Sequence, residues 1–262
     1  MNASVRQLLN DFDGLSPAEK YEATAELLRR TLEQASPELS DEAFAEAASA
    51  MMPGWRVNSV EDVRFRAPFK FYRDEPRVVT VRAIFRQDED TVVAECELVG
   101  SREIQGQAQS TVHFTGCVRM APSGAEAPTE LKLALQRDNC IDAANIYKTY
   151  FHGPAYQVLR RVWCDGSKWV GELNGSLPPN HSPSHVPLLA APRLIELCFQ
   201  TAGIAEIATE HRMGLPESVE RIQFHAAAEP CGPVYAIVSG NDAQVVDESG
   251  RPVLTLTGYR TT

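Results

Sequence analysis

Two residues one helical turn apart offer the clearest chemistry in the chain. Glu196 and Gln200 lie in Pro192–Thr209, which we expect to be a helix because proline stands at its first position. Residues four apart share one face of a helix, so the carboxyl and the amide should meet. The neighbours of Glu196 are apolar, which predicts a half-buried carboxyl that can act as a general acid. The alternative is a surface glutamate on an amphipathic helix.

A second candidate segment, Tyr150–Gln157, reads Tyr-Phe-His-Gly-Pro-Ala-Tyr-Gln. Gly153 permits a close approach of the backbone to a neighbour, and Pro154 fixes the turn into the strand that follows. His152 stands directly before this turn, and an imidazole exchanges protons near neutral pH. The alternative is an ordinary turn followed by a core aromatic, Tyr156.

The two segments, in this order and at this spacing, resemble the dehydratase domains of polyketide and polyunsaturated fatty acid synthases. Tyr150–Gln157 is similar to their Tyr-x-Gly-Pro-x-Phe-Gln signature, and the helix around Glu196 is similar to Leu-Leu-Asp-Ala-x-x-Gln. The resemblance covers about residues 42–262. It implies an α+β double hotdog, in which two fused subdomains each wrap an antiparallel sheet round a long central helix.

The resemblance also implies an activity, the dehydration of 3-hydroxyacyl thioesters on an acyl carrier protein by a hydro-lyase. That reaction needs a base for the α-proton, an acid for the leaving β-hydroxyl and a donor for the enolate oxygen. Glu196 would be the acid, in place of the family's aspartate, and Gln200 would orient it. The residues implied to contact the acyl chain are Tyr150, Gly153, Pro154, Tyr156, Leu189 and Pro192.

The base is the part that departs from the family's pattern. None of the six histidines begins the His-x-x-x-Gly-x-x-x-x-Pro motif that supplies it in the first hotdog. His152 is the best candidate for contact with the substrate, although it belongs to the same half as Glu196. His113 and His185 are further candidates, each with a structural or solvent-exposed role as the alternative. A residue of a partner chain is the remaining source of a base.

Two functions are therefore open. The first is a dehydratase-type enzyme of polyketide or fatty acid assembly, with Glu196, Gln200 and His152 as its catalytic residues. The second is a catalytically impaired module of the same fold, which binds an acyl chain or scaffolds a synthase. The missing motif favours the second, and the two matching segments favour the first.

The pattern of the chain divides it into four parts. Residues 1–40 read as an N-terminal helical extension, 41–121 as the first hotdog, 122–130 as a linker rich in proline and small residues, and 131–262 as the second hotdog. Each hotdog combines one helix with a meander. The expected helices and strands are Ala43–Met52, Val78–Arg86, Thr91–Val99, Thr111–Met120, Val158–Trp163, Trp169–Leu173, Pro192–Thr209, Ser218–Ala227, Val234–Ser239, Gln244–Asp247 and Val253–Tyr259.

Composition excludes several classes of protein. The 262 residues are 44% hydrophobic and 23% charged, with a net charge of −10, which argues against binding nucleic acid or an anionic membrane. We expect a cytoplasmic protein, since neither a membrane span nor a secretory signal is visible. The six cysteines form no Cys-x-x-Cys pair and predict reduced thiols without zinc. No cofactor is expected, because a carrier protein's phosphopantetheine holds the substrate; that carrier and other synthase components are the expected partners.

Overall fold

The computed structural model describes residues 39–69, 79–104, 107–122, 139–181, 184–185, 188–225 and 232–262, together with Gly14. The predicted N-terminal extension (1–40) and linker (122–130) lie almost wholly outside these residues. None of the described helices is long and apolar enough to cross a membrane.

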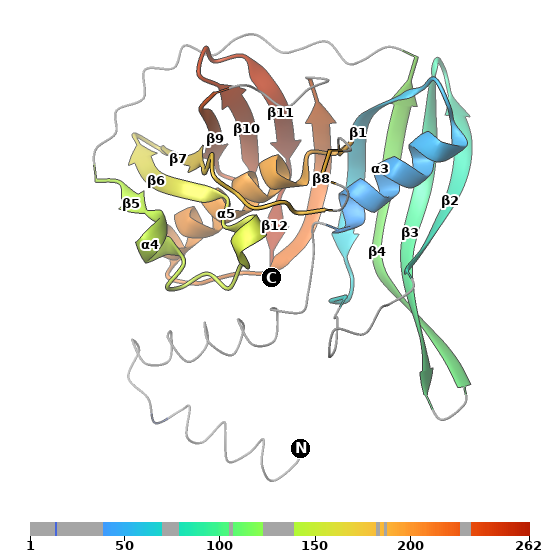
Figure 1. The fold of residues 1–262 in the computed structure, drawn as a ribbon, viewed down its shortest axis with the longest axis horizontal. Coiled ribbons are helices and arrows are strands. Elements are labelled where there is room, and N and C mark those ends of the chain that lie inside the picture. The colour runs from blue at the N-terminus through green and yellow to red at the C-terminus, as the bar shows by residue number, and fades with distance from the viewer. Residues whose placement is uncertain are drawn as a thin grey trace.

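The first half is one helix laid across an antiparallel sheet (Figure 1). Helix α3 (Leu39–Met51) is rich in alanine, and Asp41 and Glu42 stand in its first turn, where negative charge favours a helix. It ends before Gly54, whose φ of 87° suits glycine. The strands of this half are β1 (Arg56–Phe65), β2 (Val79–Asp88), β3 (Thr91–Ile104) and β4 (Gln107–Ala121).

One apolar face of α3 forms the core of the first half. Phe44 and Ala48 of this helix are fully buried and pack in one cluster with Leu98, Phe114 and Val118 of the sheet. Glu46, on another face, is exposed. The helix is therefore amphipathic, and its buried stripe fixes it to the sheet.

The second half repeats this plan around a longer helix, α5 (Pro192–Glu210). Its other elements are β5 (Ile141–Asp142), α4 (Ala143–Ile146), a 3₁₀ helix (Pro154–Tyr156), β6 (Leu159–Asp165), β7 (Lys168–Leu173), β8 (Pro216–Phe224), β9 (Val234–Ser239), β10 (Asp242–Asp247), β11 (Pro252–Thr257) and β12 (Arg260–Thr261). Ten of the 19 residues of α5 are buried, because strands wrap it (Figure 1). A Cβ at Gly171 would overlap the side chain of Thr201, so glycine here lets β7 lie close against the helix.

A single antiparallel sheet joins the two halves. Its strands follow the order β2-β3-β4-β1-β8-β11-β10-β9-β7-β6-β5, with β12 also paired to β8. The two halves meet where β1 pairs with β8, for example at Val60 opposite Ile222 and Val63 opposite Val219. Backbone hydrogen bonds therefore cross the boundary between the halves. This architecture confirms the predicted α+β double hotdog.

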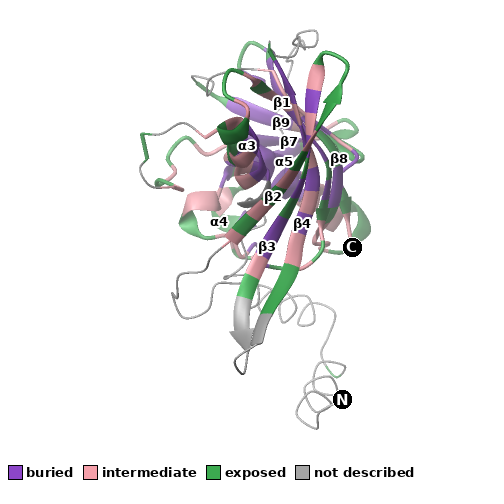
Figure 2. Cartoon of the chain, turned by 90° about the vertical axis from the view of Figure 1, so that its right-hand side faces the viewer, coloured by how far each residue is buried: buried purple, intermediate pink, exposed green. Residues whose placement is uncertain are grey.

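Most predicted elements are confirmed within a few residues. The helix predicted at Pro192–Thr209 runs one residue further, to Glu210. Strands β3 and β4 are longer than the predicted Thr91–Val99 and Thr111–Met120. Their polar ends continue the hydrogen-bonded ladder beyond the core, where Ser101 pairs with Ser110. Figure 2 shows this change along both strands from buried to exposed residues, which explains why hydrophobic alternation missed the extension.

Candidate active site

Helix α5 brings the predicted carboxyl and amide together. Glu196 and Gln200 are each only 2% exposed, so the carboxyl is more deeply buried than the half burial expected from its neighbours. Gln200 Nε2 donates a hydrogen bond of 2.8 Å to Glu196 Oε1. The predicted meeting of these two side chains across one helical turn is confirmed.

The segment before β6 folds over this part of α5. The Tyr150 hydroxyl donates to the carbonyl of Gln200 at 2.8 Å. Gln200 Nε2 donates in turn to the carbonyl of Tyr156 at 2.8 Å. The short 3₁₀ helix Pro154–Tyr156 turns the chain here, closed by a hydrogen bond of 2.9 Å from Tyr156 N to the carbonyl of Gly153. These contacts bring His152 over Glu196.

His152 contacts the buried carboxyl directly. Its Nε2 lies 2.8 Å from Glu196 Oε1, and its side chain is 12% exposed. The ring stacks on Phe151 at 4.7 Å between centroids and meets the edge of Tyr150 at 5.4 Å. Nδ1 is buried and has no hydrogen-bond partner among the described residues. Donation from Nε2 to the carboxylate would leave the lone pair on Nδ1.

Tyr147, which the sequence analysis did not single out, completes the network. Its hydroxyl donates to Gln200 Oε1 at 2.7 Å and accepts from the backbone N–H of Leu159 at 2.7 Å. Because the amide oxygen is engaged, the amide nitrogen of Gln200 faces Glu196. Burial, together with the charge of Glu196, raises the pKa of Tyr147 and keeps the phenol protonated. Its helical context in the sequence carried no sign of this long-range contact.

A small cavity of about 50 Å³ opens beside these groups. The residues that line it are Tyr150, Phe151, His152, Glu196, Phe199, Gln200, Gly203, Met213, Gly214, Leu215, Pro216 and Tyr259. The Tyr259 ring stacks on Phe199 at 4.5 Å, and burial raises the pKa of Tyr259, as do the charges of Glu196 and Glu206. The walls are largely apolar, so the polar pair is held in surroundings of low polarity. The sequence analysis missed Tyr259 and the segment 213–216, whose apolar residues look like ordinary core.

The other predicted contacts of the acyl chain lie apart from this cavity. Gly153 and Pro154 are exposed and do not line it. Leu189 is 44% exposed. Pro192 is buried at the start of α5 and lines a separate pocket of about 320 Å³. Of the predicted substrate contacts only Tyr150 lines the cavity, while Tyr156 supports it through its carbonyl; their contact with an acyl chain stays a prediction.

Glu42 of the first half contacts the start of α5. Its carboxylate accepts hydrogen bonds from the backbone N–H groups of Leu189 and Ala190, at 2.6 and 2.7 Å. Burial raises the pKa of Glu42, although these two hydrogen bonds act in the opposite direction. Ala191, the next residue, adopts a left-handed conformation with φ of 46°. The residues directly before the active-site helix are thus anchored by the other half of the molecule.

The remaining described histidines lie elsewhere. His113 Nδ1 lies 3.0 Å from the carbonyl of Ala67, and its ring meets Phe69 edge-on. His185 is exposed. Neither lines the cavity, and nor do His181, His211 and His225, so within the described part of the chain His152 is the histidine that the fold brings to Glu196.

Comparisons with known proteins agree with this architecture. The family model described as the polyketide synthase dehydratase N-terminal domain matches residues 121–262, which is more than half of the chain. No curated protein matches the sequence.

Solved structures show the same fold at low identity. The dehydratase domain from the CurF module of the curacin polyketide synthase is 18% identical, with a TM-score of 0.69 over 87% of this chain and 86% of that one. An inactive CurJ dehydratase variant, with histidine replaced by phenylalanine, is 17% identical, with a TM-score of 0.66 over 86% and 81%. An inactive CurK dehydratase variant, with aspartate replaced by asparagine, is 19% identical, with a TM-score of 0.60 over 83% and 78%.

Proposed function

Because the chain belongs to the polyketide synthase dehydratase family, we propose that it dehydrates 3-hydroxyacyl thioesters presented by an acyl carrier protein. The family gives a dehydratase-like role in polyketide assembly, alongside other components of a synthase. The observation that carries the finer proposal is the 2.8 Å contact between His152 Nε2 and Glu196 Oε1 beside an apolar cavity. This elimination requires a base and an acid, and an imidazole and a carboxyl group can fill these two roles.

Glu196 is the proposed acid. Its Oε1 receives the hydrogen bond from Gln200 and the contact from His152. The other oxygen, Oε2, is the one we assign to carry the proton that the β-hydroxyl of a bound substrate takes. Hydroxide is a poor leaving group, and an acid assists the reaction by protonating the hydroxyl so that it leaves as water.

His152 is the proposed base, acting through Nδ1. This nitrogen removes the proton from the α-carbon, the electron pair forms the Cα–Cβ double bond, and the Cβ–O bond breaks. The departing hydroxyl takes the Oε2 proton of Glu196 and leaves as water. The imidazolium then passes its Nε2 proton to Glu196 Oε1 across the 2.8 Å contact, so that both groups are neutral again.

A second function, an acyl-binding module without turnover, rests on a different observation. The acid and the histidine both belong to the second half, and the described histidine of the first half, His113, is held by Ala67 away from the cavity. A base placed across the interface, as the resemblance implies, is not among the described residues. In this interpretation the hydrogen-bond network around Gln200 has a structural role: it maintains the shape of a binding cavity and takes no part in catalysis.

The deciding experiment is mass spectrometry of a carrier protein loaded with a 3-hydroxyacyl chain. We expect the intact chain to remove one water from this substrate and Glu196→Gln to lose the activity, because the amide cannot donate the required acidic proton. Glu46→Gln is the matched control, since Glu46 is an exposed glutamate on the other central helix.

Three outcomes separate the functions. Loss of water with the wild type and Glu46→Gln, but not with Glu196→Gln, supports the dehydratase. Equal dehydration by all three proteins overturns the role of Glu196. No dehydration by any protein, with the loaded carrier still bound, supports the binding module.

A further inference from the structure

The shared sheet ends differently in the two halves. Its strand order places β2-β3-β4-β1 on one side of the seam and β8-β11-β10-β9 on the other, so β2 and β9 occupy equivalent positions. Beyond β9 the sheet continues with β7, β6 and β5. Beyond β2 it has no further strand among the residues that the structure describes, and Figure 1 shows β2 at the outer side of the first half.

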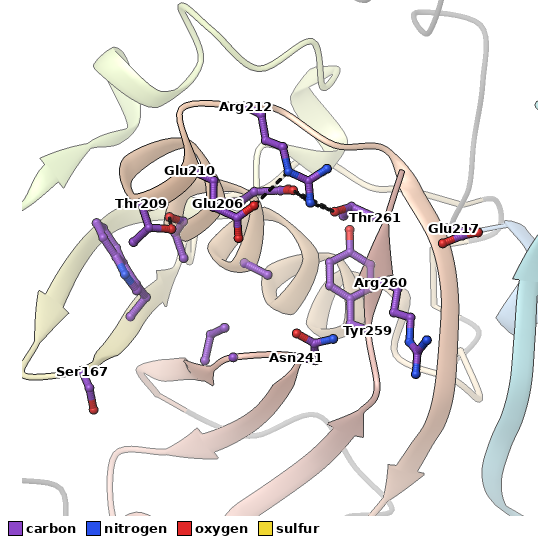
Figure 3. A pocket seen from close by; sticks show the side chains of 15 residues that line it. Ser167, Glu206, Thr209, Glu210, Arg212, Glu217, Asn241, Tyr259, Arg260 and Thr261 are labelled. Carbon is purple, nitrogen blue, oxygen red and sulfur yellow. Dashed lines mark hydrogen bonds and ion pairs between the residues drawn. The ribbon is translucent and has the colours of Figure 1, made fainter.

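The second half shows which kind of neighbour this position accommodates. β9 pairs antiparallel with β7, for example at Ile237 opposite Val170. Figure 3 shows one end of this contact, where Ser167 in the turn before β7 and Asn241 in the turn after β9 line one pocket at the C-terminal end of α5. The strand equivalent to β2 is therefore completed by another antiparallel strand.

The two equivalent strands differ in burial. Four of the six residues of β9 are buried, whereas none of the ten residues of β2 is. Alternate residues of β2 (Val79, Val81, Ala83 and Phe85) pack against the core of the first half but stay half-buried. On its other face Ile84 is 62% exposed. Both faces of β2 thus keep apolar surface that an additional strand would cover.

β2 lacks several features that keep an exposed edge from pairing. Natural edge strands are often short, or carry lysine, proline or a bulge. β2 has ten residues, contains neither lysine nor proline, and pairs with β3 in unbroken register from Val79 opposite Gly100 to Asp88 opposite Thr91. Its outer backbone N–H and C=O groups therefore form a regular row of donors and acceptors.

The charges at this edge favour a second copy of the chain over a strongly charged partner. Arg82 lies 4.0 Å from Glu97, and Arg86 lies 3.3 Å from Glu95, both on the neighbouring strand β3. The edge is therefore nearly neutral, although the chain as a whole carries a net charge of −10. Two such edges can approach without the repulsion that like-charged surfaces experience.

The sequence of β2 is also self-complementary. Two copies related by a two-fold axis pair antiparallel, and residues directly opposite each other point to the same face of the sheet. With the axis at Ala83, Val81 of one copy lies opposite Phe85 of the other on the face that packs against the core. On the exposed face Arg82 lies opposite Ile84, whose side chain can pack on the arginine stem.

We propose that β2 joins two copies of this chain by antiparallel β2–β2 pairing centred on Ala83, so that one sheet runs through both. The neighbouring registers are less favourable, because an axis at Ile84 sets Arg82 opposite Arg86, and an axis at Arg82 sets that residue opposite itself. The contact lies in the first half, away from the candidate active site. It holds for a dehydratase and for a binding module alike.

The mass of the intact chain in solution tests the proposal. Light scattering and sedimentation should give twice 28.9 kDa at protein concentrations of about 50 μM. Ile84→Lys sets a second cation opposite Arg82 at both symmetric contacts, and should raise the dimer dissociation constant about tenfold or more. The exposure of Ile84 makes this substitution compatible with the folded chain, and thermal unfolding verifies that each variant folds.

A second variant tests the register and a third is the matched control. Adding Arg82→Glu to Ile84→Lys sets a carboxylate at position 82 opposite an ammonium at position 84 of the other copy, and should restore the dimer. Ile141→Lys is the same substitution in β5, at the opposite end of the sheet, and should keep the dissociation constant of the wild type.

A dimer that is lost in Ile84→Lys, kept in Ile141→Lys and regained in the double variant supports the proposal. A wild type that stays monomeric to about 200 μM overturns it, as does a dimer that Ile84→Lys leaves intact or that Ile141→Lys dissociates. Failure of the double variant to dimerise would overturn the register centred on Ala83. Amide hydrogen exchange tests the contact without a substitution: exchange in β2 should slow as the wild type dimerises, and an unchanged rate contradicts the pairing.

Discussion

The two halves share one architecture, but a glutamate in the middle of α3 and a glutamate in the first half of α5 lie in opposite environments. In the first half, Glu46 of α3 is exposed, and the helix contributes apolar side chains to its sheet. In the second, Glu196 of α5 is 2% exposed and touches both His152 and Gln200. The difference arises from what covers each helix, since the segment Tyr147–Gln157 folds over α5 and supplies partners to its buried polar groups.

This contrast indicates that the fold alone does not create the site. A hotdog half supplies a long helix against a sheet, and α3 shows that this is compatible with a purely structural core. The polar cluster of α5 is held by hydrogen bonds and an ion-pair contact between Glu196 and Gln200 and the residues of the covering segment. The first half contributes indirectly, through the Glu42 carboxylate that holds the start of α5.

Replacing one histidine in each half tests the contrast most strongly. We expect His152→Gln to lower the dehydration rate by about 10²–10⁴-fold, the usual range for loss of a general base. His113→Gln, which loses the contact with the Ala67 carbonyl and the edge-on packing against Phe69, should leave the rate within about twofold and cost about 1 kcal/mol of stability. Carrier-protein mass spectrometry gives the rates. A large rate loss in His113→Gln would place the base in the first half instead.

Truncating the first core should affect folding and not chemistry. Phe44 is fully buried in α3, so Phe44→Ala should cost about 3–5 kcal/mol of unfolding free energy. Because β1 pairs with β8, we expect urea unfolding, followed by fluorescence and circular dichroism, to remain a single transition. Two separate transitions would show that the halves unfold independently despite the shared sheet.

The carboxylate of Glu61, where β1 pairs with β8, lies among arginine side chains. Its surroundings predict that the stability of the fold depends on pH. Burial alone would raise the pKa of Glu61, but hydrogen bonds from Arg119 and Ser59 and the charges of Arg119 and Arg221 outweigh it and lower the pKa below 4.5. With a lowered folded pKa, the ionised carboxylate stabilises the fold above pH 4.5, and this contribution disappears as the pH falls through the folded pKa.

Glu61→Gln should therefore cost about 1.5–3 kcal/mol at pH 7, and the difference from the wild type should shrink on acidification below about pH 4. Urea unfolding at several pH values measures this. Glu95→Gln, at an exposed ion pair with Arg86, is the control, with an expected cost under about 1 kcal/mol at every pH. A constant difference between Glu61→Gln and the wild type would contradict the assignment.

The smallest expected effect concerns the support of Gln200. Tyr147→Phe leaves the Leu159 N–H without its acceptor and frees the Gln200 amide to turn away from Glu196. We expect a stability loss of about 1–2 kcal/mol and a lower kcat with KM nearly unchanged. Unfolding and steady-state kinetics give the two quantities. A stability loss without any fall in kcat would restrict Tyr147 to a structural role.

The local pattern of apolar and polar residues was sufficient to predict most helices and strands and one contact of the candidate site, between Glu196 and Gln200. The helix around Glu196 and its meeting with Gln200 follow from helical periodicity, and the long apolar strands from alternation. Both depend on residues close in sequence, whose geometry a regular element fixes. The fold class followed from the resemblance carried by Tyr150–Gln157 and the helix at Pro192.

The contacts between residues far apart in the chain could not be predicted from the sequence. His152 and Glu196 belong to one half, which argued against their meeting in the family's manner, yet the turn at Gly153 brings the imidazole onto α5. Tyr147 and Tyr259 reach the site from segments that read as ordinary core. Conversely, the exposure of Pro154 depends on how the turn is packed and not on its residue type. Such facts depend on tertiary folding, which no local periodicity records.

The seam between β1 and β8 has a consequence for how such a molecule can change over time. Main-chain groups hold the two halves in register, and every amino acid except proline offers the same groups. Side chains on either side can therefore be exchanged without altering the mutual orientation of the halves. One half is free to lose its catalytic side chains and keep only a structural role, while the other half gains such side chains. The pairing of β1 with β8 stays unchanged.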